Sequence, residues 1–502
     1  MILSKAQINR YLRHIIIPEI SGPGQKKITE SKIYLYASTV QEASSLIYYL
    51  AASGIGCISC YFKDNHGYEN LYKNIQDLNV DVVVELPDNQ IPIEYNNALY
   101  NDGFILRILI SKYENLEDNL ISFFSSQDCS KSIPTILAVN NGWKGYLQTF
   151  CTKEDFDCLH ENHLPLDLNS LVNNTYEKEG SILSNCLLGA LTTVECMKLC
   201  LNLGTILDRP LHFNLLSMEF CKSDNKIFNS AITEFLKNKC SDNQLSADFQ
   251  NNILYKNLSD SKVLIVGTGG LGSPVAYALS YLGIGTIGLV DYDKVEISNL
   301  NRQILHSVSR IDMTKVESAE VFIKTINPDV KVVTYNTSLN ANNAIDIIKD
   351  YDVIIDGVDN FPTRYLLNDS CFFANKPLVD AAAVRFHGLL MTILPNKGPC
   401  YRCAFPTMPN QNGAMSCSEA GVLGPVPGVM GFIQAAEVVK LILGIGEPLC
   451  NRIIYFDSLD SDFDTINMNR STNCDLCGTE PTITTLGEYN NTCESTNQKG
   501  TS

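Results

Sequence analysis

The residues best suited to chemistry in this sequence lie in a glycine-rich segment of its second half. The segment follows the apolar run Val263–Val266 and contains four glycines, Gly267, Gly269, Gly270 and Gly272. This order predicts a buried strand, a tight turn and a helix that begins near Pro274, where a proline is tolerated. Backbone N–H groups at the start of such a helix can bind a phosphate, because the helix dipole favours negative charge there. We therefore expect a nucleotide to bind at this turn.

Polar residues further along the chain distinguish between two kinds of nucleotide enzyme. Asp291 follows the apolar run Thr286–Val290, at about the distance from the glycine turn where an acid usually holds a ribose hydroxyl. Beyond it come the polar residues Ser298, Asn299, Arg302, Lys315, Asp359 and Asn360. A dehydrogenase needs no such set around its phosphates. An enzyme that splits ATP between the α- and β-phosphates does, because cations neutralise the departing pyrophosphate and a carboxylate holds magnesium.

At this point a family resemblance can be stated. Residues 261–478 resemble the MoeB/ThiF/HesA family, relatives of the ubiquitin-activating enzymes, through GTGGLGSP, DYDKVEISNLNRQ, the lysine in TKVESA, VDN, CYRC, SCSEAGVLGP and CDLCG. The resemblance implies a doubly wound α/β sheet and transfer of AMP from ATP to the C-terminal carboxylate of a small ubiquitin-like protein. It also implies that Gly270 lies on the phosphates and Asp291 on the ribose. Asn299, Arg302 and Lys315 would contact the phosphates, and Asp359 would bind Mg²⁺.

Four of the 18 cysteines form two CxxC pairs, Cys400 with Cys403 and Cys474 with Cys477. Four thiolates suit a tetrahedral zinc ion and leave no open coordination position, so we expect a structural site. The pairs are far apart in the sequence, and the metal would tie the C-terminal end of the domain to a loop near its middle. The alternative interpretation is four reduced free thiols.

Cys417 lies in the segment Met415–Gly421, before a turn rich in glycine and proline. In some members of the resembling family a cysteine here links covalently to the carrier protein after adenylation. A thiolate that attacks an acyl-adenylate would give a thioester, or an acyl-disulfide after sulfur transfer. Other members stop at the adenylate, and both possibilities stay open for Cys417.

The first half of the chain repeats the second. Ser31–Tyr36 parallels Ser261–Val266, and the Glu195/Lys198 pair parallels Glu437/Lys440. A repeat of this length indicates a duplicated domain, not a solenoid. We therefore predict two tandem Rossmann-like, doubly wound domains that form an internal pseudo-dimer, with a zinc knuckle in the second.

The first copy lacks the residues that would bind ATP. Ala37–Ala43 stands where the second copy has its glycine turn, and its side chains would crowd a phosphate while Glu42 would repel it. Phe62 falls near the position of the ribose acid. We expect this half to be inactive.

One segment of the first half keeps a predicted role. Arg10–Ile20 resembles the N-terminal helix of the family, from which an arginine reaches the partner's ATP site. The matching residue is Arg13, so we expect it to complete the active site of the second half. The alternative is that Arg13 is a surface charge on a helix.

Length, net charge and hydrophobic pattern limit the number of domains, the class of partner and the location of the protein. A chain of 502 residues suggests two or three domains, and the net charge of −17 argues against nucleic acid as the main partner. The first residues lack the apolar core of a signal peptide, and Gly421–Gly446 contains prolines, Glu437 and Lys440, which favour a buried helix over a membrane span. We expect a cytoplasmic protein with an inactive domain (1–221), a linker (222–260), an active domain (261–480) and a polar, disordered tail (481–502).

These features predict an enzyme that uses ATP and Mg²⁺, with structural Zn²⁺. Its substrate would be the C-terminal glycine of a ubiquitin-fold sulfur carrier or modifier that ends in Gly-Gly, and we expect the sulfur donor to be a separate protein. The attacking group is already a carboxylate, so no general base is required. The alternatives are adenylation of a short ribosomal peptide and a non-catalytic module that binds a peptide or carrier.

Overall fold

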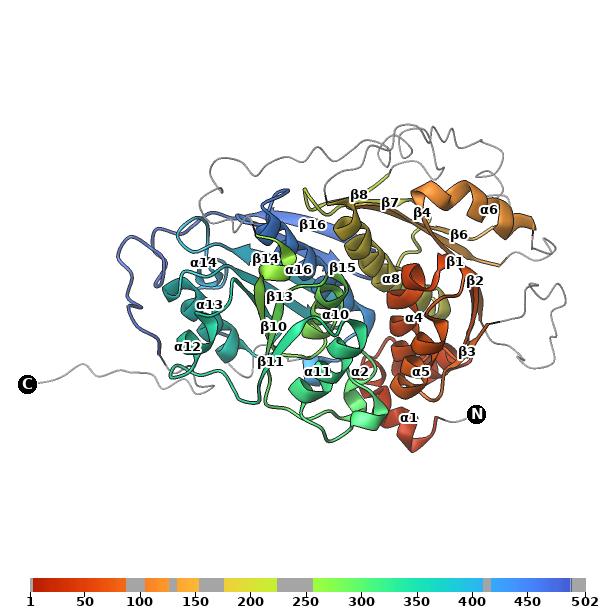
Figure 1. The fold of residues 1–502 in the computed structure, drawn as a ribbon, viewed down its shortest axis with the longest axis horizontal. Helices are drawn as coiled ribbons and strands as arrows, with labels where there is room; N and C mark the ends of the chain where they lie inside the picture. The colour runs from red at the N-terminus through yellow and green to blue at the C-terminus, as the bar shows by residue number, and fades with distance from the viewer. Residues whose placement is uncertain are drawn as a thin grey trace, which may run out of the picture.

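The computed structural model describes residues 3–86, 104–125, 133–152, 176–223, 256–409, 417–487 and 489. These residues form two eight-stranded sheets with the same connectivity (Figure 1). The orders are β3-β2-β1-β4-β5-β6-β7-β8 and β11-β10-β9-β12-β13-β14-β15-β16. The expected duplication and tandem Rossmann-like fold are therefore confirmed. Most of the predicted linker, 222–260, lies outside the described residues.

The first half contains the following elements. The strands are β1 (Lys32–Thr39), β2 (Cys57–Asp64), β3 (Val83–Glu85), β4 (Ile105–Lys112), β5 (Thr135–Asn141), β6 (Lys144–Phe150), β7 (Leu211–Asn214) and β8 (Glu219–Lys222). The helices are α1 (Lys5–Arg10), α2 (Leu12–Ile15), α3 (Ser21–Thr29), α4 (Val40–Ser53), α5 (Tyr68–Leu78), α6 (Leu116–Ser125) and α8 (Glu177–Leu201), with the 3₁₀ turn η1 (Tyr113–Asn115).

The second half repeats this order. Its strands are β9 (Lys262–Val266), β10 (Thr286–Val290), β11 (Lys331–Tyr335), β12 (Val353–Asp356), β13 (Leu378–Val384), β14 (His387–Ile393), β15 (Arg452–Asp457) and β16 (Asp462–Asn467). Its helices are α10 (Gly272–Leu282), α11 (Lys315–Ile326), α12 (Ala344–Ile348), α13 (Phe361–Phe373), α14 (Tyr401–Ala404), α15 (Cys417–Ala420) and α16 (Pro425–Leu443), with the 3₁₀ turns η4 (Leu258–Asp260), η5 (Ile297–Asn299) and η6 (Val308–Arg310).

Each sheet is parallel over its first five strands and antiparallel over its last three. In the second sheet the strand order reverses between β9 and β12, and ligands of doubly wound folds bind beyond the carboxyl ends of the strands at such a point. β9, β10 and β12 therefore bring the glycine turn, Asp291 and Asp359 to the same edge of the sheet.

The two halves pack through helices into one continuous core. Helices α4 and α8 of the first half contact α10 and α16 of the second, and α8 and α16 lie side by side between the sheets (Figure 1). Both long helices are apolar enough to span a membrane by length and composition, but they are largely buried inside the protein. The internal pseudo-dimer is thus confirmed, and Gly421–Gly446 forms a turn and a buried helix as expected.

A buried ion pair repeats in the two long helices. Lys198 lies 2.8 Å from Glu195, and Lys440 lies 2.6 Å from Glu437, with all four side chains buried. Each lysine also reaches the other half, because Lys198 donates to Ser461 Oγ at 2.7 Å and Lys440 to the carbonyl of Leu216 at 3.4 Å. The repeated pairs therefore help to join the two halves.

The first half has lost the phosphate-binding turn altogether. No residue separates β1, which ends at Thr39, from α4, which begins at Val40. The Glu42 carboxylate accepts the N–H of Ser38 at 3.2 Å, and burial raises the pKa of Glu42. We expect side chains to crowd a turn at this position, but the structure has no turn there. The strand and the helix are longer instead and meet directly. A polar cavity of about 750 Å³ remains at this end of the sheet. Its acids Glu42, Asp64, Glu114 and Glu177 outnumber its lysines Lys112 and Lys178, which disfavours a polyphosphate.

The beginning of the C-terminal tail is packed, which corrects the expectation of disorder for that part. Ile483, Leu486 and Tyr489 are partly buried against the apolar core of the second half. The Tyr489 hydroxyl donates to Asp369, and the Arg402 guanidinium lies over the Tyr489 ring, 5.3 Å from its centroid. The remainder of the predicted tail lies outside the described residues.

Candidate active site

The glycine turn connects β9 to α10 by close backbone contacts. Gly267 has a φ of +91°, and a Cβ there would lie 2.7 Å from the carbonyl oxygen of Gly357. A Cβ on Gly272 would lie 2.0 Å from the Gly267 carbonyl oxygen. A Cβ on Gly269 would meet only Gln303 Nε2, at 3.4 Å, whereas one on Gly270 would lie 3.2 Å from Pro427 of α16 and 3.6 Å from Arg302 Cδ. The first and last glycines therefore shape the turn, Gly270 lets α16 and Arg302 pack close to it, and Gly269 leaves its surface open.

Asp291 is joined directly to the glycine turn. Its Oδ2 accepts the backbone N–H of Thr268 at 2.8 Å and the Thr268 hydroxyl at 3.0 Å, and its Oδ1 accepts the N–H of Asp293. The side chain is 8% exposed. Asp291 thus lies where the sequence places it and also braces the turn. Its contact with ribose stays a prediction.

His306, which the sequence analysis did not select, also forms a hydrogen bond with the glycine turn. Its Nε2 lies 3.1 Å from the carbonyl oxygen of Thr268, and its Nδ1 lies 2.9 Å from Ser318 Oγ. Because a carbonyl can only accept, Nε2 must carry the hydrogen and Nδ1 accepts from Ser318. The neutral imidazole therefore bridges the turn and helix α11.

Arg302 lies against the glycine turn, with its Cδ 3.6 Å from the place of a Cβ on Gly270. Its Nη1 donates to the Ser298 carbonyl at 3.0 Å and to Asn301 Oδ1 at 2.8 Å. Asn299 Oδ1 accepts the N–H of Glu296, and the Ser298 hydroxyl donates to the Glu296 carboxylate. The structure therefore uses Ser298 and Asn299 to shape the segment that carries Arg302.

Lys315 and three carboxylates surround Tyr292 at the edge of the sheet. Lys315 begins α11 and its ammonium lies 2.7 Å from Asp293 Oδ2. The negative charge of Asp293, burial, and the charges of Asp359 and Asp291 raise the pKa of Tyr292, and Lys315 opposes them. Asp359 is exposed. This arrangement gathers predicted site residues from the ends of β10 and β12 and from the start of α11, and an exposed carboxylate is a suitable ligand for Mg²⁺.

The loop that carries Asp359 is fixed at both of its ends. Asn360 caps α13, since its side chain accepts the N–H of Thr363 at 3.0 Å. The buried Arg364 donates to the carbonyl of Val358 at 2.9 Å and lies between the carboxylates of Asp356 and Asp380, 3.5 and 3.4 Å away. Sequence analysis missed this cluster, because its three members lie on separate elements.

An apolar pocket of about 550 Å³ begins beside this loop. Phe361 and Arg364 line it from α13, His387 and Tyr455 from the sheet, and Phe405 from the segment after α14. Its walls are mostly carbon, so it suits an extended or apolar segment better than a charged one. No motif in the sequence indicated this pocket.

The N-terminal helices of the first half reach this site. Helix α1 contacts η5, and α2 contacts α15, the short helix that begins with Cys417. The carbonyl of Arg13 accepts the N–H of Val422 at 3.2 Å. The N-terminal helices therefore contact both the η5 turn before Arg302 and the short helix that begins with Cys417, while the Cys417 side chain lies outside the described residues.

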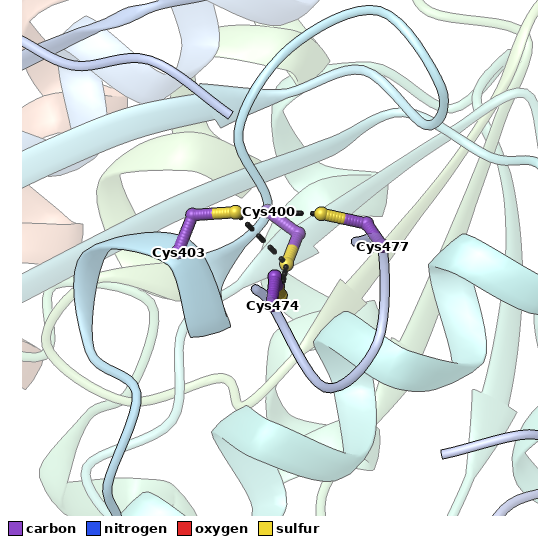
Figure 2. A group of neighbouring side chains, drawn as sticks. All are labelled: Cys400, Cys403, Cys474 and Cys477. Carbon is purple, nitrogen blue, oxygen red and sulfur yellow. Dashed lines mark hydrogen bonds between the residues drawn. The ribbon is translucent and has the colours of Figure 1, made fainter. Parts of the chain in front are cut away.

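The four predicted metal-ligating cysteines converge on one point (Figure 2). Their sulfur atoms all lie within 4.8 Å of one another, with Cys400 3.5 Å from Cys474 and Cys403 3.3 Å from Cys477. A tetrahedral zinc with Zn–S bonds of about 2.3 Å needs neighbouring sulfurs roughly 3.8 Å apart, so the four thiols fit this ion.

Lowering the pH from 7 to 5 should destabilise the protein through two buried histidines. Burial lowers the pKa of His14 to about 4 and that of His306 to about 3, whereas the unfolded chain keeps a value near 6.5. Below pH 6.5 the unfolded state binds more protons than the folded state. The free energy of unfolding therefore decreases as the pH is lowered, by about 2 kcal/mol per histidine between pH 7 and pH 5. Denaturant unfolding of the wild type and His306→Gln at both pH values checks this. The variant should lose about 2 kcal/mol less than the wild type, and equal losses would contradict the assignment.

Comparisons with known proteins find relatives of part of this chain. A model of the ThiF family matches residues 241–476. "Adenylyltransferase and sulfurtransferase MOCS3" of Dictyostelium discoideum is 45% identical over 240 residues, which is 47% of this chain and 56% of that protein. The protein of the same name from Bos taurus is 45% identical over 239 residues, or 47% and 52% of the two chains. The chain spans about half the length of these curated relatives. The crystal structure of E. coli MccB is 27% identical with a TM-score of 0.40, and the match covers 46% of this chain and 68% of that one.

Proposed function

Since residues 241–476 of this chain form a ThiF-family domain, we propose that the protein transfers AMP from ATP to the C-terminal glycine of a small ubiquitin-fold sulfur carrier. The observation that carries the proposal is the gathering of an open glycine turn, Arg302, Lys315 and an exposed Asp359 at one edge of the sheet. Similarity to proteins named adenylyltransferase and sulfurtransferase supports adenylation, and it favours a sulfur carrier over a protein modifier.

The residues of the site divide the work of the reaction. The glycine turn binds the phosphates through backbone N–H groups, and Asp291 lies where the ribose would be held. The carrier carboxylate attacks the α-phosphorus, the bond to the pyrophosphate oxygen breaks, and pyrophosphate leaves. Arg302 and Lys315 offset the charge that develops on the leaving group. Asp359 would hold Mg²⁺, which neutralises phosphate charge when bound.

The two halves have different roles in this proposal. The first half binds no ATP and supplies Arg13 to the phosphates of the second half. The carrier tail would enter along the apolar pocket that begins at Phe361, because a Gly-Gly tail is narrow and uncharged except at its end. The Cys417 thiolate would then attack the acyl carbon and expel AMP to give a thioester. Alternatively, a separate donor protein would first transfer sulfane sulfur to Cys417, and the resulting persulfide would attack the acyl carbon and expel AMP to give an acyl-disulfide.

Exchange of labelled pyrophosphate into ATP tests the proposal. The full chain should catalyse exchange only when a ubiquitin-fold carrier ending in Gly-Gly is present, and Asp359→Asn should abolish it, because a neutral amide cannot replace the carboxylate ligand of Mg²⁺. A carrier that lacks its last glycine is the matched substrate control. Exchange with a short peptide alone would identify a peptide substrate instead. Failure to bind ATP at all would leave a binding module and overturn the proposal.

A further inference from the structure

His14 lies where three segments of the molecule meet. It is fully buried in helix α2 of the first half. Its Nδ1 lies 2.9 Å from Gln25 Oε1 on helix α3, and its Nε2 accepts the N–H of Gly424, 2.8 Å away in the second half. A Cβ on Gly424 would lie 2.4 Å from the carbonyl oxygen of Asn301, the residue before Arg302. The imidazole thus joins the first half, the start of α16 and the Arg302 segment.

The hydrogen bonds of His14 define its protonation state. Gly424 offers a backbone N–H, so Nε2 must be the acceptor and Nδ1 carries the only ring hydrogen. Gln25 Oε1 accepts that hydrogen, and Gln25 is itself held because its Nε2 donates to the Ser53 carbonyl at 3.0 Å. A protonated ring would place a second donor against the Gly424 N–H. Burial, opposed by the hydrogen bond that His14 donates to Gln25 and aided by the positive charge of Arg302, lowers the pKa of His14, which keeps the ring neutral.

The residues around Gly424 are held from both sides. We name Gly421–Gly424 the clasp segment, which connects α15 to α16. On one side Val422 donates to the Arg13 carbonyl, and on the other Arg385 and the clasp exchange two backbone hydrogen bonds, through the Gly421 carbonyl and the Leu423 N–H. Arg385 also pairs with Glu19 of the first half at 2.7 Å. The first half and the β13–β14 turn therefore enclose the clasp segment together.

We propose that His14 is a positioning residue through which the inactive first half sets the place of the clasp segment. The expected effect of His14 on catalysis rests on the proposed function, whereas the hydrogen bond from Gly424 to His14 does not. The clasp fixes the start of α16, whose Pro427 lies against Gly270, and it follows directly after α15 with Cys417. Loss of the His14 acceptor would therefore shift both the phosphate turn and the segment that bears Cys417.

Two variants of the full chain separate the hydrogen bond from simple packing. His14→Leu keeps a similar volume but removes the acceptor, whereas His14→Gln retains an oxygen that can accept from Gly424. We expect His14→Leu to speed amide hydrogen exchange in the peptide 421–426 about tenfold, since one buried hydrogen bond is lost. We expect kcat for pyrophosphate exchange to fall about tenfold and KM for ATP to rise, because a displaced phosphate turn both orients and binds ATP less well. His14→Gln should restore these values to within about threefold.

A control variant distinguishes positioning from a general loss of stability. Ile28→Val removes one buried methyl group from α3, the helix of Gln25, and leaves the clasp contacts intact. It should not change amide exchange at 421–426. If it produces the same change as His14→Leu, or if His14→Leu leaves that exchange unchanged, the inference is wrong. A wild-type protein without pyrophosphate exchange on any carrier would defeat the proposed function, while the hydrogen-exchange comparison would still decide the role of His14.

Discussion

Arg302→Ala is expected to lower carrier-dependent pyrophosphate exchange by about a hundred- to a thousandfold, the usual effect of removing one charge-stabilising donor from a transition state. The Arg302 side chain lies against Gly270 and is oriented by the Ser298 carbonyl and Asn301 Oδ1. The fixed guanidinium therefore needs little reorganisation when charge develops on the leaving pyrophosphate. Initial rates at saturating ATP and carrier measure the effect, and thermal unfolding checks that the variant is folded.

Three further substitutions make this test specific. Arg302→Lys keeps the charge but loses the planar fork, so its rate should lie between those of the wild type and the alanine variant. Arg13→Ala should also reduce exchange without unfolding the protein, if the first half completes the site. Arg452→Ala is the matched control, because Arg452 donates to the Ser217 carbonyl of the other half, outside this site. An Arg302→Ala rate within about threefold of the wild type would rule out the phosphate role.

The sequence predicted those parts of the molecule that leave a local pattern. The Glu195/Lys198 and Glu437/Lys440 pairs recur at helical spacing, and both prove to be buried ion pairs. Each CxxC motif is recognised from the spacing of its two cysteines, and in the fold the four thiols lie close together. The glycine turn and Asp291 follow apolar runs, so their places at the strand ends could be read directly from the order of residues.

The supporting contacts of the site could not be predicted in this way. His306 and Arg364 are single polar residues within ordinary helical or turn sequence, and their partners come from distant elements. His14 acts on a backbone N–H that lies 410 residues further along the chain. Similarly, the sequence showed that Ala37–Ala43 lacks the glycines of the phosphate turn, but not that β1 and α4 would lengthen to remove the turn. The Glu42 carboxylate accepts the N–H of Ser38, a local contact, but the burial of Glu42 depends on tertiary packing that no local propensity encodes.

Loss of the four-cysteine cluster should have the largest effect on stability. Cys400 and Cys403 flank or lie in α14, and Cys474 and Cys477 lie beyond β16, so a bound zinc ion cross-links two segments that are far apart in sequence. The chain after Cys477 returns to pack Ile483, Leu486 and Tyr489 on the same core. Metal loss would therefore release both the knuckle and the packed part of the tail, and leave four thiols crowded together.

Cys474→Ser is expected to abolish binding of one zinc ion per chain and to lower the unfolding temperature of the second half by roughly 10 °C. This corresponds to about 3 kcal/mol, a fraction of the free energy that zinc supplies to small zinc-dependent domains, since the rest of the core persists. Metal analysis and calorimetry measure both quantities. Cys221→Ser is the matched control, because Cys221 is exposed and outside the cluster. A purified wild type without zinc, or a Cys474→Ser variant with unchanged zinc content and melting, would show that the thiols are free and that the fold does not depend on a metal.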